Sequence, residues 1–375
     1  MIKADNFEDK ILNKNPSLLR SLSAKKSNNF NFNKIKKFKK FKTVVIIGMG
    51  GSILGSKALY SFLRHKIKKN FIFIDNLDFK LLKSVNIKKD ASKFLFIIIS
   101  KSGNTTETIL NAGYFKNYLK KNNVIIISEK KNNSLSTLAK NKNFFFIKHN
   151  PHIGGRYSIF SEVGMVPAYL MGLNPYKIKK KLLQFYKNKK NLILSKKNTK
   201  KLYQKKIKTL VFFNYVPQLD DFLFWCQQLL AESLGKNKKG FIPVISNAPK
   251  DHHSLMQLYL DGPKKNFYTF FNVLNEKSLK INNNKILYSH RYLKNKSLAK
   301  ILYSQKLAAE KVFLRKKIPF RSFEVLKRNE KTLGELFCFF ILETILLGRS
   351  LNVNPFDQPS VELIKKETKQ ILINS

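Results

Sequence analysis

Cysteine is scarce in this sequence, which has only two cysteines, Cys226 and Cys338, among 375 residues. They lie far apart, each within an apolar stretch. The sequence therefore excludes a scaffold held together by disulfides and predicts two buried thiols in a reducing compartment. No group of histidines, cysteines and carboxylates has the spacing of a metal site, so we expect no bound metal.

Long hydrophobic runs are also missing. The most apolar stretch, residues 336–347, contains Glu343 and is too short to cross a bilayer, so it predicts a buried helix. Residues 1–10 carry early acidic residues and have none of the apolar core of a signal peptide. The sequence therefore predicts a soluble cytoplasmic protein with no membrane partner.

Acidic residues are few, since 23 Asp and Glu stand against 72 Lys and Arg, a formal net charge of +49. Such an excess is typical of nucleic-acid-binding proteins. Here the lysines are spread along the whole chain, among many Asn, Ile and Phe residues that A/T-rich codons favour. The patterns of helix-turn-helix, zinc-finger and aromatic single-strand-binding proteins are missing. We therefore expect no nucleic-acid partner and a basic surface that attracts anionic substrates.

What the chain does have is two series of short β-branched and aromatic runs, separated by segments of helical length. Continuous apolar runs are typical of strands buried on both faces of a parallel sheet. The predicted strands are 44–47, 71–74, 94–99, 124–127 and 144–147, then 209–213, 241–245, 267–273 and 318–325. The predicted helices are 218–234, 298–315 and 331–347, with a helical zone over 158–206 and a polar excursion over 276–295. The pattern predicts an α/β protein of two doubly wound parallel-sheet domains with helical connections and a C-terminal helix.

The first predicted strand runs into a glycine-rich turn, GMGGS at 48–52. Ile53 stands where a dinucleotide fingerprint needs a third glycine, and Ser56 stands where a Walker loop needs a lysine. The backbone amide of Gly51 and the hydroxyl of Ser52 would still lie at the N-terminus of the next helix. A helix N-terminus of this kind is a general site for an anion such as phosphate. For this segment alone, a tight turn without a ligand is the alternative.

A hydroxyl-rich loop, SKSGNTTET at 100–108, follows the third predicted strand. Ser100, Ser102 and Thr105 supply hydroxyl donors around Lys101, so the loop suits a phosphate dianion. The alternative is an elaborate helix N-cap. Two such loops at the carboxyl ends of parallel strands, where open α/β sheets bind ligands, favour a phosphorylated ligand.

Four further motifs follow these two loops in order: GGRYS at 154–158, ESLGK at 232–236, HSLMQ at 253–257 and FDQPSVELIK at 356–365. With them, the chain resembles the phosphoglucose isomerase family, built from sugar isomerase domains, over about residues 43–369. The resemblance implies two sugar isomerase domains at 1–165 and 207–350, a helical connection at 166–206 and a C-terminal active-site segment at 351–375. It also implies that Gly51, Ser52, Ser100, Lys101, Ser102, Thr105 and Gln358 bind the substrate.

The resemblance makes Glu232 the general base, which moves a proton between adjacent sugar carbons through an enediolate. We expect Glu232 in the last turn of a helix, where carbonyl dipoles disfavour a carboxylate. An exposed i,i+4 pair with Lys236 is the alternative. Arg156 follows two glycines, and the resemblance implies that its guanidinium stabilises the enediolate; a structural salt bridge is its alternative role.

The resemblance assigns opening of the cyclic sugar to His253, contributed across a dimer interface, with Lys365 as its partner. The family's spacing of histidine and glutamine favours His253 over its neighbour His252. Because Pro359 suits the first position of a helix, we expect Gln358 and Lys365, about two helical turns apart, on one helix face.

The resemblance therefore implies a cofactor-free homodimeric isomerase that interconverts glucose 6-phosphate and fructose 6-phosphate. Two alternatives stay open. One is a bifunctional isomerase that also accepts mannose 6-phosphate, and the other is a non-catalytic regulator that binds sugar phosphates. The presence of Glu232 argues against the regulator, since a regulator has no need of a base.

Overall fold

The computed structural model describes residues 15–23, 31–87, 91–188, 202, 206–274, 278–281 and 288–374. Its first sheet has five strands in the order β2-β1-β3-β4-β5, all parallel. Their bounds are β1 Thr43–Gly48, β2 Asn70–Ile74, β3 Phe94–Ile99, β4 Val124–Glu129 and β5 Phe145–His149. Each lies on one of the apolar runs of the first predicted series.

The second sheet has four strands in the order β7-β6-β8-β9, again all parallel. Their bounds are β6 Thr209–Asn214, β7 Ile242–Asn247, β8 Asn266–Val273 and β9 Phe320–Val325. The predicted α/β class with two doubly wound parallel sheets is therefore confirmed.

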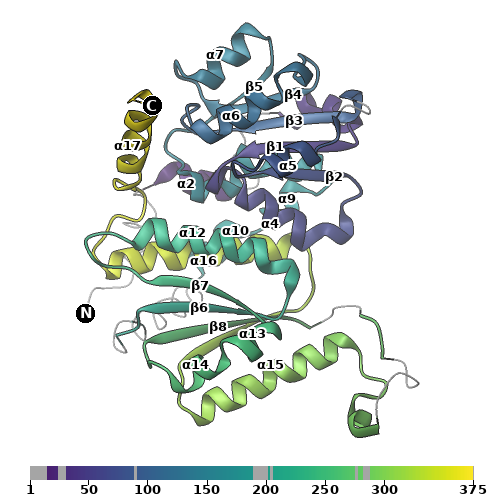
Figure 1. Ribbon diagram of the computed structural model, residues 1–375, viewed down its shortest axis with the longest axis vertical. Coiled ribbons are helices and arrows are strands. Elements are labelled where there is room, and N and C mark those ends of the chain that lie inside the picture. Colours follow the sequence, from purple (N-terminus) through teal and green to yellow (C-terminus); the bar gives the residue numbers. More distant parts are fainter. Residues whose placement is uncertain are drawn as a thin grey trace.

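Helices separate the strands along the chain, and three of them, α4, α12 and α16, lie between the two sheets (Figure 1). The helices are α2 Pro16–Leu22, α3 Phe32–Ile35, α4 Leu54–Leu63, α5 Phe79–Ser84, α6 Thr106–Tyr114, α7 Ser134–Asn141, α8 Glu162–Leu170, α9 Pro175–Ile178 and α10 Leu182–Lys187, then α12 Asp220–Leu234, α13 Lys250–Ser254, α14 Met256–Asp261, α15 Leu298–Arg315, α16 Glu330–Ser350 and α17 Val361–Asn374. The predicted domain boundary at residue 165 falls inside α8. Part of the predicted helical zone, residues 189–201 and 203–205, lies outside the described residues, as do 276–277 and 282–287 of the polar excursion.

One hydrophobic core joins the two sheets. Alternate residues of β1 face opposite sides of the first sheet, so that Ile46 packs into this shared core and Ile47 into a cluster on the outer face. Phe212 of β6 belongs to the shared core too. Between them Trp225 of α12 packs edge-on against Phe337 of α16, with ring centroids 4.7 Å apart. A shared core holds the two halves in a fixed relation, so that both can contribute to one site.

The predicted buried thiols are confirmed, since Cys226 and Cys338 are both fully buried in the helical layer. Burial raises the pKa of each thiol well above its ordinary value. Among the described helices, none is long and apolar enough to span a bilayer.

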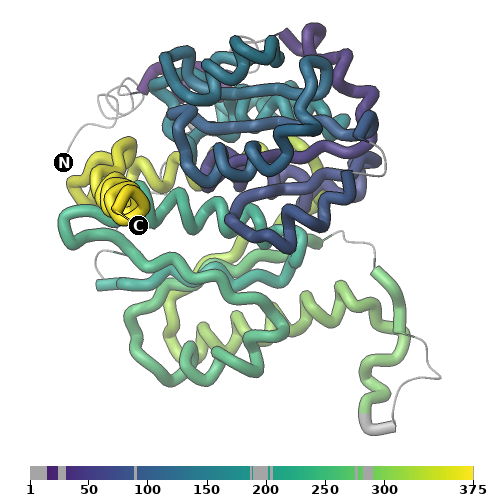
Figure 2. Tube along the Cα trace, turned by 45° about the horizontal axis from the view of Figure 1, so that its top comes forward, coloured from purple at the N-terminus to yellow at the C-terminus, as the bar shows by residue number. Residues whose placement is uncertain are grey.

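Helix α17 is the exception to this packing, because none of its side chains is buried. It lies at the edge of the molecule in both views, in yellow (Figures 1 and 2). Its apolar residues are largely exposed, with Leu363 at 64%, Ile364 at 75% and Ile371 at 66%. Within one chain, α17 therefore has an apolar surface without a covering partner.

Candidate active site

The glycine turn after β1 packs directly on the short helical turn η7, Gly155–Phe160, that carries Arg156. A Cβ atom placed on Gly51 would lie 2.2 Å from the carbonyl carbon of Gly155 and 2.4 Å from the amide nitrogen of Arg156. Only glycine allows so close an approach of two backbones. The turn that the sequence predicts to bind an anion is thus in backbone contact with the predicted cation.

The hydroxyl-rich loop begins at the same edge of the sheet, because β3 lies beside β1 and Ile99 pairs with Gly48. The Ser100 and Thr105 hydroxyls lie 2.8 Å apart, and the amide of Gly103 donates to the Ser100 hydroxyl at 3.1 Å. Gly103 has a φ of 73°, and a Cβ there would clash with Asn133. The loop is therefore folded tightly back on itself, with its hydroxyls gathered at the start of α6.

Lys101 lies in this loop and is half-buried. Burial lowers the pKa of its ammonium group below the ordinary value. The neighbouring charges of Lys131 and Arg156 act in the same direction, whereas Glu129 opposes them. Lys101 therefore lies within electrostatic range of Arg156, and its amine loses a proton more readily than that of a surface lysine.

Arg156 is held by acceptors from two distant parts of the chain. Its Nε donates to the Ser233 hydroxyl at 2.7 Å, and its Nη1 donates to Oε1 of Glu232 at 2.8 Å. The C-terminal segment supplies the rest: Oε1 of Gln358 at 2.7 Å, the Pro355 carbonyl at 2.7 Å and the Asp357 carbonyl at 3.0 Å. The side chain is only 1% exposed. The guanidinium is therefore fixed in place, with Glu232 as one of its acceptors.

Glu232 lies in the last turn of α12, as predicted, and its carboxylate is held at both oxygens. Arg156 donates to Oε1, and the amide of Gln228, one helical turn earlier, donates to Oε2 at 2.9 Å. The side chain keeps 22% of its surface exposed. The alternative pair with Lys236 does not form, because Lys236 lies 2.7 Å from Oδ1 of Asp357 instead. The carboxylate is thus oriented and still accessible to a substrate.

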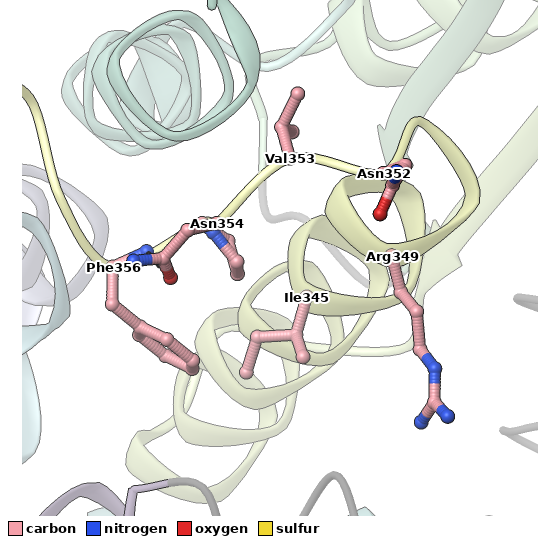
Figure 3. A pocket seen from close by; sticks show the side chains of 7 residues that line it. Ile345, Arg349, Asn352, Val353, Asn354 and Phe356 are labelled. Atoms are coloured by element: carbon pink, nitrogen blue, oxygen red, sulfur yellow. Dashed lines mark hydrogen bonds between the residues drawn. The ribbon is translucent and has the colours of Figure 1, made fainter.

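The segment after α16 runs across the site and closes one side of it. Lys236 anchors this segment through Asp357 and through the Asn354 carbonyl. Figure 3 shows this segment after the end of α16, with Ile345 and Phe356 on one side of the chain and Val353 pointing away from them. The segment lines a pocket of about 400 Å³. The segment is therefore a strap that supplies acceptors to Arg156 and also lines a pocket.

The predicted placement of Lys365 is wrong. Helix α17 begins at Val361, after Pro359, so Gln358 lies outside the helix and does not share a face with Lys365. Gln358 turns instead to Arg156. Lys365 is exposed and pairs with Glu362 within its own helix at 2.7 Å. Pro359 and Ser360 form a turn, and the helix starts only at Val361, so the proline does not take the first helical position.

His253 lies far from these residues within the chain. It is exposed on α13, which Figure 1 shows on the far side of the second sheet from α17. Its neighbour His252 turns inward, with Nε2 2.6 Å from the Tyr215 hydroxyl, and burial lowers the pKa of that imidazole. His253 is thus the histidine of the two that is open to solvent.

Several residues of the site escaped the sequence analysis. Gln228 could have been found from its i,i+4 spacing to Glu232. Ser233 and Tyr157 lie inside the motifs, and both hydroxyls turn inward, where the Tyr157 hydroxyl lies 3.0 Å from that of Ser233 and donates to the Pro355 carbonyl at 3.0 Å. Burial raises the pKa of this phenol, with Arg156 opposing the shift. The backbone acceptors of the strap have no signal in the sequence.

The fold has two parallel β-sheets with helices around one shared core, and the candidate site lies where the two halves meet. This is the fold of sugar-phosphate isomerases. A hypothetical protein from Thermus thermophilus superposes with a TM-score of 0.88 over 98% of this chain and 94% of that one, at 24% identity. A glucose-6-phosphate isomerase from Chlamydia trachomatis gives a TM-score of 0.74 over 99% of this chain and 75% of that one, at 19% identity.

The chain belongs to the phosphoglucose isomerase family, whose model matches residues 25–375. The glucose-6-phosphate isomerase of Methanocaldococcus jannaschii is 34% identical over 352 residues, which cover 90% of this chain and 86% of that protein. The glucose-6-phosphate isomerase of Mycoplasmopsis synoviae is 32% identical over 354 residues, 87% of this chain and 81% of that protein.

Proposed function

We propose that this chain catalyses the reversible isomerisation of glucose 6-phosphate and fructose 6-phosphate. The family assignment supports this reaction, and so do the names of the relatives. The observation that carries it is the contact between Arg156 and Glu232, with Nη1 and Oε1 2.8 Å apart beside the two anion loops. A carboxylate beside a fixed cation is the pair of groups that an enediolate mechanism requires, which supports the proposal.

In this mechanism the loops at 48–52 and 100–105 bind the phosphate, through backbone amides, hydroxyls and Lys101. The open-chain sugar then lies with C1 and C2 at Glu232. The carboxylate removes the proton from C2, the carbonyl at C1 becomes an enediolate oxygen, and the carboxyl group returns its proton to C1. The proton of the C2 hydroxyl moves to the C1 oxygen, so that C2 becomes the ketone and C1 carries the new hydroxyl.

Arg156 stabilises the negative charge that develops on the oxygens of the enediolate. Because strap acceptors and Ser233 already fix the guanidinium, no reorientation of this group is needed in the transition state, and preorganised charges of this kind lower barriers most effectively. The side-chain amide of Gln228 orients the other carboxylate oxygen of Glu232, Oε2, by donating to it.

Ring opening needs a second proton-transfer group, for which we propose His253 and Lys365. They lie on separate elements, α13 and α17, that one chain does not bring together. In the homodimer that we propose, His253 of a second copy would supply the group that α13 of the same chain does not bring to the site. The uncovered apolar residues of α17 support such a partner, since exposed apolar surface of this kind is typical of interfaces.

The test is an assay of the purified protein with fructose 6-phosphate, in which glucose 6-phosphate formation is followed by its oxidation with an NADP-dependent dehydrogenase. We expect turnover, with mannose 6-phosphate run in parallel to define substrate choice. Tight binding of fructose 6-phosphate without turnover would contradict the proposal and support a regulator.

A further inference from the structure

A second pocket lies outside the site described above, beside α7 and the edge strand β5. Its volume is about 730 Å³, within the range of small-molecule sites. Four lysines line it, Lys121, Lys130, Lys131 and Lys140, and its lining contains no carboxylate. The apolar part of the lining includes Phe146. The pocket thus combines several positive charges with an aromatic surface.

This combination of lysines and an aromatic ring in one concavity suits a particular class of ligand. Scattered lysines attract any anion weakly, whereas charges gathered around a concavity focus their potential on a bound ligand. A sugar monophosphate would match one or two of the lysines and leave the aromatic surface unused. A ligand with a planar apolar body and a chain of phosphates would match both features.

We propose that this pocket binds a nucleoside polyphosphate and that this binding lowers the affinity of the active site for its sugar phosphate. The second part rests on the proposed function. The base would lie against Phe146 and the phosphates among the lysines that line the pocket.

Two ion pairs that share one carboxylate connect the pocket with the phosphate loop. Glu129, whose side chain is only 8% exposed, lies 2.8 Å from the ammonium group of Lys131 and 3.8 Å from that of Lys101. The same carboxylate therefore forms an ion pair with a lysine of the pocket and with a lysine of the active-site loop. A polyphosphate that draws Lys131 away leaves Glu129 to Lys101 alone, and this tighter pair competes with the phosphate of the substrate.

The backbone provides a second connection, because residues 133–135, which lie between the lining residues Asn132 and Ser136, brace the phosphate loop. The amide of Leu135 donates to the Gly103 carbonyl at 3.1 Å, and the amide of Ser134 donates to Oδ1 of Asn104 at 2.9 Å. Asn133 fills the space left by the missing side chain of Gly103. Movement of residues 130–136 on binding is therefore passed directly to residues 100–105.

The first experiment measures binding alone, so its outcome does not depend on isomerase activity. Calorimetry in magnesium-free buffer compares ATP, tripolyphosphate and inorganic phosphate as probes. We expect ATP to bind most tightly and K130A/K140A to weaken it at least tenfold. The control K83A/K311A removes the same charge from exposed sites elsewhere and should bind ATP as the wild type does. S100A/T105A, which alters the active-site loop, should also bind it normally.

Equal losses in K130A/K140A and K83A/K311A would overturn the site, because they would show a response to net charge only. Loss of ATP binding in S100A/T105A alone would place ATP in the active site and overturn it too. Tripolyphosphate binding as tightly as ATP would overturn the assignment to a nucleoside ligand.

The second experiment measures the coupling. ATP should raise the KM for fructose 6-phosphate several-fold in the wild type with little change in kcat, and E129Q should lose this response while still binding ATP. A KM that is insensitive to ATP in a wild type that binds ATP would overturn the regulatory part of the proposal. A protein that binds ATP as expected but has no isomerase activity would contradict the proposed function and leave the binding site standing.

Discussion

Arg156 and Glu232 form a direct ion pair in which Nη1 lies 2.8 Å from Oε1, although 75 residues separate them in the chain. The arginine follows the first sheet, and the glutamate ends a helix of the second half. The shared core brings them together, and the strap beyond α16 holds the arginine from the other side. The site is thus assembled from three separate parts of the chain, and each part suggests a measurement.

The anion loops should determine affinity for the phosphate group. S100A/T105A removes two hydroxyls that lie 2.8 Å apart at the start of α6. Each charge-assisted hydrogen bond contributes about 1–3 kcal/mol, so the affinity for 6-phosphogluconate, used as a phosphorylated probe, should fall by at least tenfold. Calorimetry measures this affinity directly. Unchanged affinity in a variant with wild-type circular dichroism would place the phosphate elsewhere.

Lys236 should act on the reaction through the strap, since it anchors Asp357 and does not touch Glu232. The pair is partly exposed, so K236M should cost about 1 kcal/mol or less, no more than about fivefold in kcat/KM. D357N should have the same effect, and the double variant should lose no more than either single variant. K238M, at an exposed neighbour, is the control. Additive losses would show that the two side chains act independently.

Lys179 should make the stability of the fold depend on pH. Burial lowers the pKa of its ammonium group from 10.5 to about 7, with Glu162 opposing the shift. Between these values the folded protein has released a proton that the unfolded chain still binds, so this group makes the unfolding free energy rise with pH. Its contribution is complete above pH 10.5 and is lost as the pH falls through about 7.

Urea titrations at several pH values from neutral to alkaline test this behaviour. Relative to K179M, the wild type should gain stability as the pH rises, whereas K180M, at an exposed position, should follow the wild type. A constant difference between K179M and the wild type over that range would show that Lys179 keeps its proton in the folded state.

His253 should act on the site of a second copy. H253A and E232Q should each be nearly inactive alone, but a mixed dimer has one site with both groups intact. After exchange of subunits in an equal mixture, activity should recover to about a quarter of the wild-type value, because half of the dimers are mixed and one site in each is complete. No recovery after exchange has been verified by mass spectrometry would show that each site is built from one chain.

The fold was largely predictable because continuous apolar runs in parallel strands give a strong local signal, and β3 and α15 have the predicted bounds. The contact between Arg156 and Glu232 was not predictable from local pattern, since it depends on how the two halves pack. Local rules also misplaced Lys365, because a proline that suits a helix start equally suits a turn before the helix. Backbone acceptors such as the Pro355 carbonyl could not be predicted either, because every residue type carries a backbone carbonyl.

The central claim is that Glu232 is the base. E232Q keeps the shape of the side chain and an oxygen for Arg156, but it removes the ability to accept a proton. E335Q is the matched control, since Glu335 forms an ordinary i,i+4 pair with Lys331 at 3.5 Å on α16 and its loss should cost only a few tenths of a kcal/mol.

The most direct measurement is the exchange of the C2 hydrogen of glucose 6-phosphate with solvent, followed by NMR in deuterated water alongside kcat. In E232Q both rates should fall by about 10²–10⁴, the usual contribution of a positioned base, with KM changed little and E335Q behaving as the wild type does. Wild-type rates of both exchange and turnover in E232Q would contradict the assignment.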